Sequence, residues 1–109
     1  MYKCKNCGYV HWLENLPEKC PKCFSKKEVF QLLSEEESSK IEESLLTNEL
    51  LIEMIDTLNK LLDISEEGLE DNLDEGCKKI FSSIYKQSIE HIQEIKAEIE
   101  THIKNNKWG

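Results

Sequence analysis

The chain has 109 residues, which is enough for one small domain or two very small ones. Its 22 acidic and 14 basic residues give a net charge of −8, and because nucleic-acid binding depends on neutralising phosphates, we expect no DNA or RNA partner. No apolar run approaches the length of a membrane span and nothing at the N-terminus looks like a signal peptide, so we expect a cytoplasmic protein with no membrane partner.

The charge is unevenly distributed along the chain. Residues 1–33 contain six lysines and three glutamates, whereas residues 34–109 contain 8 basic and 19 acidic residues. Two segments with opposite balances indicate two structural units. We therefore predict a small metal domain over residues 1–33 and an acidic helical segment over residues 34–109.

Four of the five cysteines lie in the first 23 residues with the spacing C-x2-C-x12-C-x2-C; they are Cys4, Cys7, Cys20 and Cys23. A C-x-x-C pair lets two sulfurs reach one metal from a single tight turn, and two pairs complete a tetrahedral S4 shell that suits zinc or iron. A segment this short rarely folds without such a staple, so loss of the metal should unfold it. Two disulfides in an exported miniprotein are the alternative.

Three runs of residues around these cysteines resemble the rubredoxin-like domain of rubrerythrins. They are Tyr2-Lys-Cys-Lys-Asn-Cys-Gly-Tyr-Val-His11, then Leu16-Pro-Glu-Lys-Cys-Pro-Lys-Cys23, and then Val29-Phe-Gln-Leu-Leu33. The resemblance covers about the first third of the chain. It implies a three-stranded antiparallel sheet and one Fe(Cys)4 centre that exchanges single electrons with a redox protein partner, with Tyr9 and Phe30 beside the site.

The sequence departs from this family pattern at several points. Phe24 stands where rubredoxins usually have a second glycine, and Glu18 and Lys19 replace the tryptophan that usually precedes the second cysteine pair. We expect Trp12 to cover the small core instead. The order of the two segments is also inverted, since the metal domain of common rubrerythrins follows the helical one.

The acidic segment reads as two helices joined by a polar turn. Ser34 and Glu37 form the pattern of a capping box, and apolar residues then recur at helical spacing from Ile41 to Leu62. The polar stretch 65–76 contains Gly68 and is predicted to be the turn, with at most a short helical turn inside it. A second helix is predicted over residues 74–104.

The apolar stripe of the first helix covers more than half of its circumference, which is wider than one partner helix can bury. The simplest way to cover this apolar face is a homodimer in which two antiparallel hairpins form one four-helix bundle. A different protein partner would satisfy the same pattern. The predicted fold class is therefore a small α+β chain, with a three-stranded knuckle domain followed by a long helical hairpin.

A few other residues could carry chemistry. Cys77 lies on the apolar stripe of the second helix and is interpreted as a small core residue. His91 and His102 are roughly 16 Å apart along a helix, so one metal cannot bridge them within a chain. The Glu-x-x-His motif of rubrerythrin di-iron sites is absent, and Glu90, Glu94 and Glu98 form a stripe that is usually solvated. Trp108 is interpreted as part of a frayed tail.

Three hypotheses about function follow from these observations. The first is a small electron-transfer protein with one Fe2+/Fe3+ ion in the Cys4 site, shielded by Tyr9, Trp12 and Phe30, and helices that dimerise or dock. The second is a redox-inert structural Zn2+ ribbon on a helical protein-interaction module, since thiolates accept either metal. A di-iron enzyme related to rubrerythrin is the third, and it requires more than one iron per chain.

Overall fold

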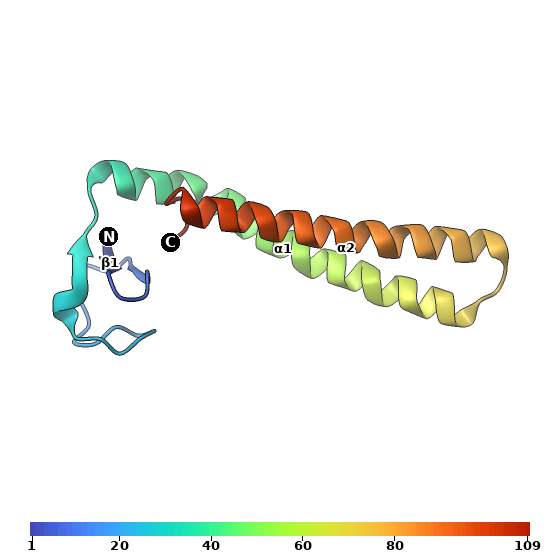
Figure 1. The fold of residues 1–109 in the computed structure, drawn as a ribbon, viewed down its shortest axis with the longest axis horizontal. Coiled ribbons are helices and arrows are strands. Elements are labelled where there is room, and N and C mark those ends of the chain that lie inside the picture. Colours follow the sequence, from blue (N-terminus) through green and yellow to red (C-terminus); the bar gives the residue numbers. More distant parts are fainter. The chain divides into compact units, whose positions relative to one another are not determined.

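The structure is a computed structural model that describes residues 1–109. The chain divides into two compact units, one made of Met1–Leu45 and Asn106–Gly109, and the other of Leu46–Asn105. The first unit contains the small sheet and the beginning of helix α1, and the second contains the helical hairpin (Figure 1).

The sheet of the first unit has the three antiparallel strands that the family resemblance implies. Strand β1 (Tyr2–Cys4) lies between β2 (Val10–His11) and β3 (Phe30–Leu32). Tyr2 pairs with His11 on one side and with Leu32 on the other, and Cys4 pairs with Phe30. A short 3-10 helix, η1 (Lys27–Val29), leads into β3.

Few apolar side chains form the core of this unit. Val10, Leu33 and Ile41 are buried together, and Met1 packs against them half-buried. The C-terminal residues also belong here: a Cβ on Gly109 would lie 3.0 Å from Ile41 and 3.1 Å from Val10, and Trp108 is half-buried. The tail that was predicted to fray therefore packs against the first unit, because its backbone closes over the Val10–Ile41 contact.

Helix α1 (Glu35–Asp71) begins with the predicted capping box. The Glu37 backbone N–H donates to Ser34 Oγ at 3.1 Å, and the Ser34 backbone N–H donates to Glu37 Oε1 at 3.1 Å. These bonds satisfy two of the backbone donors that a helix N-terminus leaves unpaired. They also lower the pKa of Glu37, since the hydrogen bonds from Ser34 favour its ionised form.

The predicted end of the first helix is wrong. The helix continues through the polar stretch to Asp71, so its 37 residues extend for about 55 Å, and the turn is only Asn72–Asp74. Ser65 is buried within the helix, and Gly68 lies directly against the ring of Phe81 on the facing helix. The ring of Phe81 fills the space that a side chain at residue 68 would need, and the helix continues through this glycine.

Helix α2 (Glu75–Lys104) matches its predicted bounds. Asp74 caps it, because its Oδ1 accepts a hydrogen bond from the Cys77 backbone N–H at 2.7 Å. Within the unit Leu46–Asn105, α2 runs antiparallel to α1 (Figure 1). No helix of the chain is long and apolar enough to cross a membrane.

Polar residues interrupt the seam between the two helices. The His102 ring donates from Nδ1 to Asn48 Oδ1 at 2.5 Å, and both residues are buried. His102 Nε2 lies 3.3 Å from a carboxylate oxygen of Glu98. Since a buried polar group is costly without its partner, the Asn48–His102 pair favours one register of the hairpin over its alternatives.

Candidate metal centre

The four predicted cysteines converge on one point in the first unit. Their sulfur atoms all lie within 4.8 Å of one another, and no other group of three or more potential metal-ligating side chains is found. Cys4 Sγ lies 3.7 Å from Cys23 Sγ, and Cys7 Sγ lies 3.6 Å from Cys20 Sγ. A tetrahedral ion with metal–sulfur bonds of about 2.3 Å needs sulfurs about 3.8 Å apart. The set therefore fits one tetrahedral metal ion, and all four cysteines are free thiols.

The two C-x-x-C pairs are held by equivalent backbone turns. The Gly8 N–H donates to the Cys4 carbonyl at 2.8 Å, and the Phe24 N–H donates to the Cys20 carbonyl at 2.9 Å. The first cysteine of each pair also donates its backbone N–H to the carbonyl oxygen of the residue five positions later. These bonds, from Cys4 to Tyr9 and from Cys20 to Ser25, are both 2.8 Å long. Each turn thus buries its first cysteine, Cys4 or Cys20, and leaves its second half-buried.

Phe24 adopts the conformation of the glycine that it replaces. Its φ is +61°, close to the +81° of Gly8 at the equivalent place in the first turn. The second turn is therefore regular although its residue is bulky. A side chain in the left-handed region costs about 1–2 kcal/mol, so the turn retains local strain. The Phe24 ring is 74% exposed and gains no burial in the chain that would offset this strain.

Polar groups around Cys23 favour its thiolate form. Ser25 Oγ lies 3.2 Å from Cys23 Sγ, and the Asn6 amide donates to Ser25 Oγ at 3.0 Å. The Cys23 thiol donates to Ser25 Oγ, and once the sulfur is a thiolate the Ser25 hydroxyl can donate to it instead. Hydrogen bonds from the Ser25 side chain, the Asn6 side chain and the Ser25 backbone lower the pKa of Cys23 to about 5.

Cys7 shows the effect of crowding four sulfurs together. A backbone hydrogen bond from Tyr9 lowers its pKa, but burial and the neighbouring thiols of Cys23, Cys20 and Cys4 raise the pKa of Cys7 to about 12 overall. The four crowded thiols therefore resist complete deprotonation in the absence of a cation. A metal ion must displace the remaining protons when it binds, as thiolate sites require.

Aromatic rings line the sheet next to the cysteine turns. Tyr9 and Phe30 meet edge to face with their centroids 6.3 Å apart, and the buried ring of His11 lies 6.2 Å from both. His11 Nε2 donates to the Asn15 carbonyl at 3.0 Å. Trp12 is 44% exposed, so His11 rather than Trp12 completes this cluster. The expectation that Trp12 covers the core is wrong, because Trp12 follows the last residue of β2 and its side chain remains exposed.

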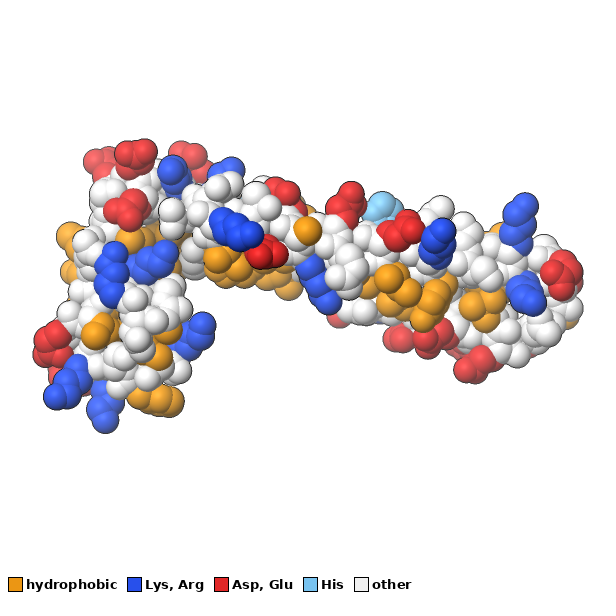
Figure 2. Space-filling model, in the orientation of Figure 1, with side chains coloured by type: hydrophobic (Ala, Val, Ile, Leu, Met, Phe, Trp, Pro, Cys, Tyr) orange, Lys and Arg blue, Asp and Glu red, His pale blue; other side chains and the backbone are white.

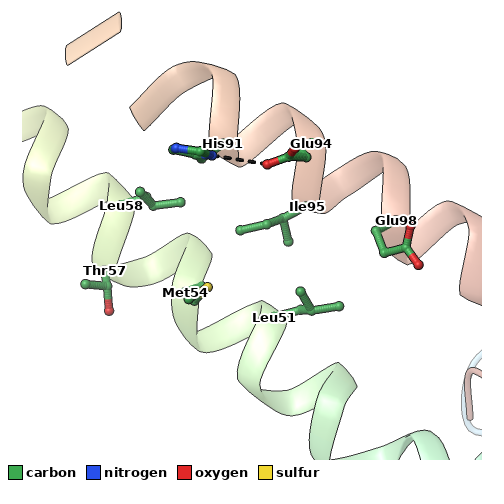
Figure 3. A pocket seen from close by; sticks show the side chains of 8 residues that line it. All are labelled: Leu51, Met54, Thr57, Leu58, His91, Glu94, Ile95 and Glu98. Atoms are coloured by element: carbon green, nitrogen blue, oxygen red, sulfur yellow. Dashed lines mark hydrogen bonds and ion pairs between the residues drawn. The ribbon is translucent and has the colours of Figure 1, made fainter. Parts of the chain in front are cut away.

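The remaining candidates lie in the hairpin and do not form a second site within the chain. Cys77 is half-buried in the first turn of α2, and hydrogen bonding and charge from Asp74 raise the pKa of its thiol. His91 is exposed and pairs with Glu94 at 3.1 Å, next to a groove of about 590 Å³ between the helices (Figure 3). His102 belongs to the buried pair with Asn48.

Asn6, Ser25 and His11 surround the centre but were not predicted from the sequence. Their effects arise from contacts across the two turns or within the sheet, so no local motif marks them. The only available signal was the position of two small polar residues close to ligand cysteines: Asn6 directly before Cys7, and Ser25 two residues after Cys23.

Comparison with protein families agrees with this geometry. The family model described as "Rubrerythrin, rubredoxin-like domain" matches residues 2–31. Neither the curated proteins nor the solved structures include a match to the chain. Residues 2–31 are therefore a rubredoxin-like domain of the rubrerythrin type, and in this chain a helical hairpin follows it.

Proposed function

We propose that this protein is a one-electron carrier whose centre is a single iron held by Cys4, Cys7, Cys20 and Cys23. The observation that carries the proposal is the hydrogen bonding around Cys23, in a domain that matches the rubrerythrin family. Bound iron would supply the electron transfer by alternating between its ferrous and ferric states. The chain itself holds the four sulfurs and stabilises their negative charge.

The hydrogen bonds at Cys23 favour the more negative, reduced state of such a centre. Hydrogen bonds to ligand sulfurs are one of the factors that set the potential of iron–sulfur sites. Ser25 and Asn6 supply two of them, and the Tyr9 backbone supplies another at Cys7. These groups would therefore adjust the reduction potential of a bound iron.

The exposure of the sulfurs also suits exchange with another protein. Cys7 and Cys23 are half-buried, whereas Cys4 and Cys20 are buried. The exposed ring of Phe24 follows Cys23 directly, and Lys22 and Lys26 are exposed on either side of it. This surface suits a redox partner with an apolar contact and an acidic rim, since complementary charge speeds the encounter.

A structural zinc ribbon is the second candidate, and the small core favours a structural role for the metal. Only Val10, Leu33 and Ile41 are buried together in the first unit, so a bound ion of either kind has to stabilise the fold. Thiolates accept zinc as readily as iron. The helical hairpin would then serve only in protein interaction.

Redox cycling of the iron-loaded chain separates these candidates. The full chain is refolded with ferrous iron, and its visible absorbance is followed through reduction and reoxidation. The electron carrier predicts a colour that bleaches and returns over repeated cycles. If the iron form loses its metal on the first cycle while the zinc form stays folded, the electron-carrier proposal is rejected and the structural zinc ribbon is retained.

Matched variants show whether the cycling depends on the proposed groups. Cys20→Ser should abolish the coloured centre, whereas Cys77→Ser, which changes the cysteine outside the cluster, should keep it. Ser25→Ala should keep the centre but lower its reduction potential, because the hydrogen bond that favours the reduced state is lost. A potential unchanged in Ser25→Ala would contradict the proposed role of this residue.

A further inference from the structure

One face of α1 is uncovered in the hairpin and repeats like a helix-packing seam. Six exposed side chains follow one another at alternating intervals of three and four residues, which is the period of helices that pack along their length. Leu50 is 51% exposed, Met54 59% and Ile64 57%. Hydrophobic side chains lie uncovered along the hairpin in Figure 2. We call this set the second stripe: Thr47, Leu50, Met54, Thr57, Leu61 and Ile64.

The second stripe is self-complementary when two copies run in opposite directions. With a two-fold axis between residues 55 and 56, Leu50 faces Leu61 of the second copy and Met54 faces Thr57. Thr47 then faces Ile64, and every contact occurs twice. The Thr57 hydroxyl already donates to the Glu53 carbonyl at 3.2 Å, so burying Thr57 leaves no unpaired polar group. We propose that the chain forms a homodimer through its second stripes, packed antiparallel around this axis.

The surface is hollowed where the axis would pass. One groove of about 590 Å³ lies between α1 and α2, and a second hollow of about 490 Å³ lies along α1. Leu51, Met54 and Thr57 line both of them. Figure 3 shows Met54 and Leu51 at the side of the groove opposite Ile95. A flexible methionine from the second copy suits such a space, since Met adapts to irregular gaps.

The charges beside the second stripe favour a second copy in this direction. Between residues 46 and 71 the helix has eight acidic residues and one basic residue, Lys60. Lys60 and Glu53 lie one heptad apart at the same edge of the stripe. In the antiparallel arrangement each of them faces the other on the second copy, giving two symmetric ion pairs. A parallel arrangement gives neither residue an opposite charge, and the acidic edge would then oppose association.

The resulting dimer would place four helices in one bundle, with each hairpin contributing two. It does not depend on the metal centre, because every residue involved lies within Leu46–Asn105. Failure of the electron-transfer proposal would therefore leave this inference unaffected.

Charge reversal tests the register of the dimer. Sedimentation equilibrium of the full chain measures the dimer dissociation constant for Glu53→Lys, Lys60→Glu and the double variant. Each single change replaces two attractive pairs with two repulsive ones and should weaken the dimer about tenfold or more. The double variant restores the attraction and should return to within about threefold of the original. Lys86→Glu is the control, since Lys86 also pairs with an acidic residue four positions away but lies on α2.

Two matched apolar changes on one helix test the stripe itself. Leu50→Gln lies on the second stripe at 51% exposure, and Ile52→Gln lies off it at 50% exposure. Leu50→Gln should weaken the dimer at least about tenfold, whereas Ile52→Gln should not change it. Helicity is checked by circular dichroism, and Leu61→Gln replaces Leu50→Gln if that variant unfolds. A chain that is monomeric at all concentrations, equal effects of the two glutamine variants, or a double charge variant that stays weak would overturn the proposal.

Discussion

Replacing Gly68 by alanine should destabilise the hairpin, although the same change stabilises most helices. A Cβ at this position would lie 2.4–2.5 Å from three ring atoms of Phe81. Atoms in ordinary contact are at least about 3.5 Å apart, so the ring must move by about 1 Å or the helices must separate. Such overpacking costs about 1–3 kcal/mol, whereas alanine gains up to about 1 kcal/mol in helix propensity. The expected net loss in the free energy of unfolding is therefore up to about 2 kcal/mol.

Urea unfolding followed by circular dichroism measures this effect. Gly76→Ala is the matched control, because Gly76 is also helical and its Cβ would meet only Asp74 Oδ1, at 3.5 Å. It should leave stability unchanged or raise it by up to about 1 kcal/mol. In a Phe81→Leu background the Gly68→Ala change should lose most of its cost, since the ring is gone. The reasoning is refuted if Gly68→Ala stabilises the chain as much as Gly76→Ala does.

Three further predictions concern the helix cap, the second cysteine turn and the metal. The hydrogen bond from the Cys77 backbone N–H lowers the pKa of Asp74 in the folded chain below its ordinary value of 3.8. The ionised Asp74 therefore stabilises the folded chain above pH 3.8, and this stabilisation is lost as the pH falls through the pKa that Asp74 has in the folded chain. Asp74→Asn should therefore reduce the difference in melting temperature between pH 7 and pH 3, and an unchanged difference would contradict this. Phe24→Gly should relieve the backbone strain at φ +61°. If that strain costs about 1 kcal/mol, zinc transfer from the variant to a chelator should be about fivefold slower. Faster transfer would argue against strain. Removing the metal should unfold the sheet but retain most of the helical circular dichroism, because the hairpin is a separate compact unit; loss of the whole signal would exclude that independence.

The parts of the fold that were predictable depend on short stretches of sequence. The cysteine turns are each set by a C-x-x-C pair, and the capping box is set by Ser34 and Glu37, three residues apart. Such local patterns determine the backbone conformation directly, because the interacting groups are neighbours in the chain. The start of α2 also depends on a local contact, since Asp74 caps the helix through the backbone N–H of Cys77, three residues later.

The parts that were not predictable depend on residues distant in sequence. The first helix continues past Gly68, which lies against Phe81 of the other helix, a contact that no local pattern reveals. The tail packs because Gly109 meets Val10 and Ile41. The wide apolar face of α1 was visible in the sequence, but its division into a seam facing α2 and an uncovered second stripe required the packed hairpin.

Metal content of the full chain, purified from cells grown with ample iron, tests the central claim most directly. The electron-carrier account predicts one iron per chain, held by the four cysteines and lost in Cys20→Ser. That iron should bleach on reduction and recover its colour on reoxidation. About one zinc per chain, together with a refolded iron form that does not cycle, would contradict the account and leave a structural ribbon.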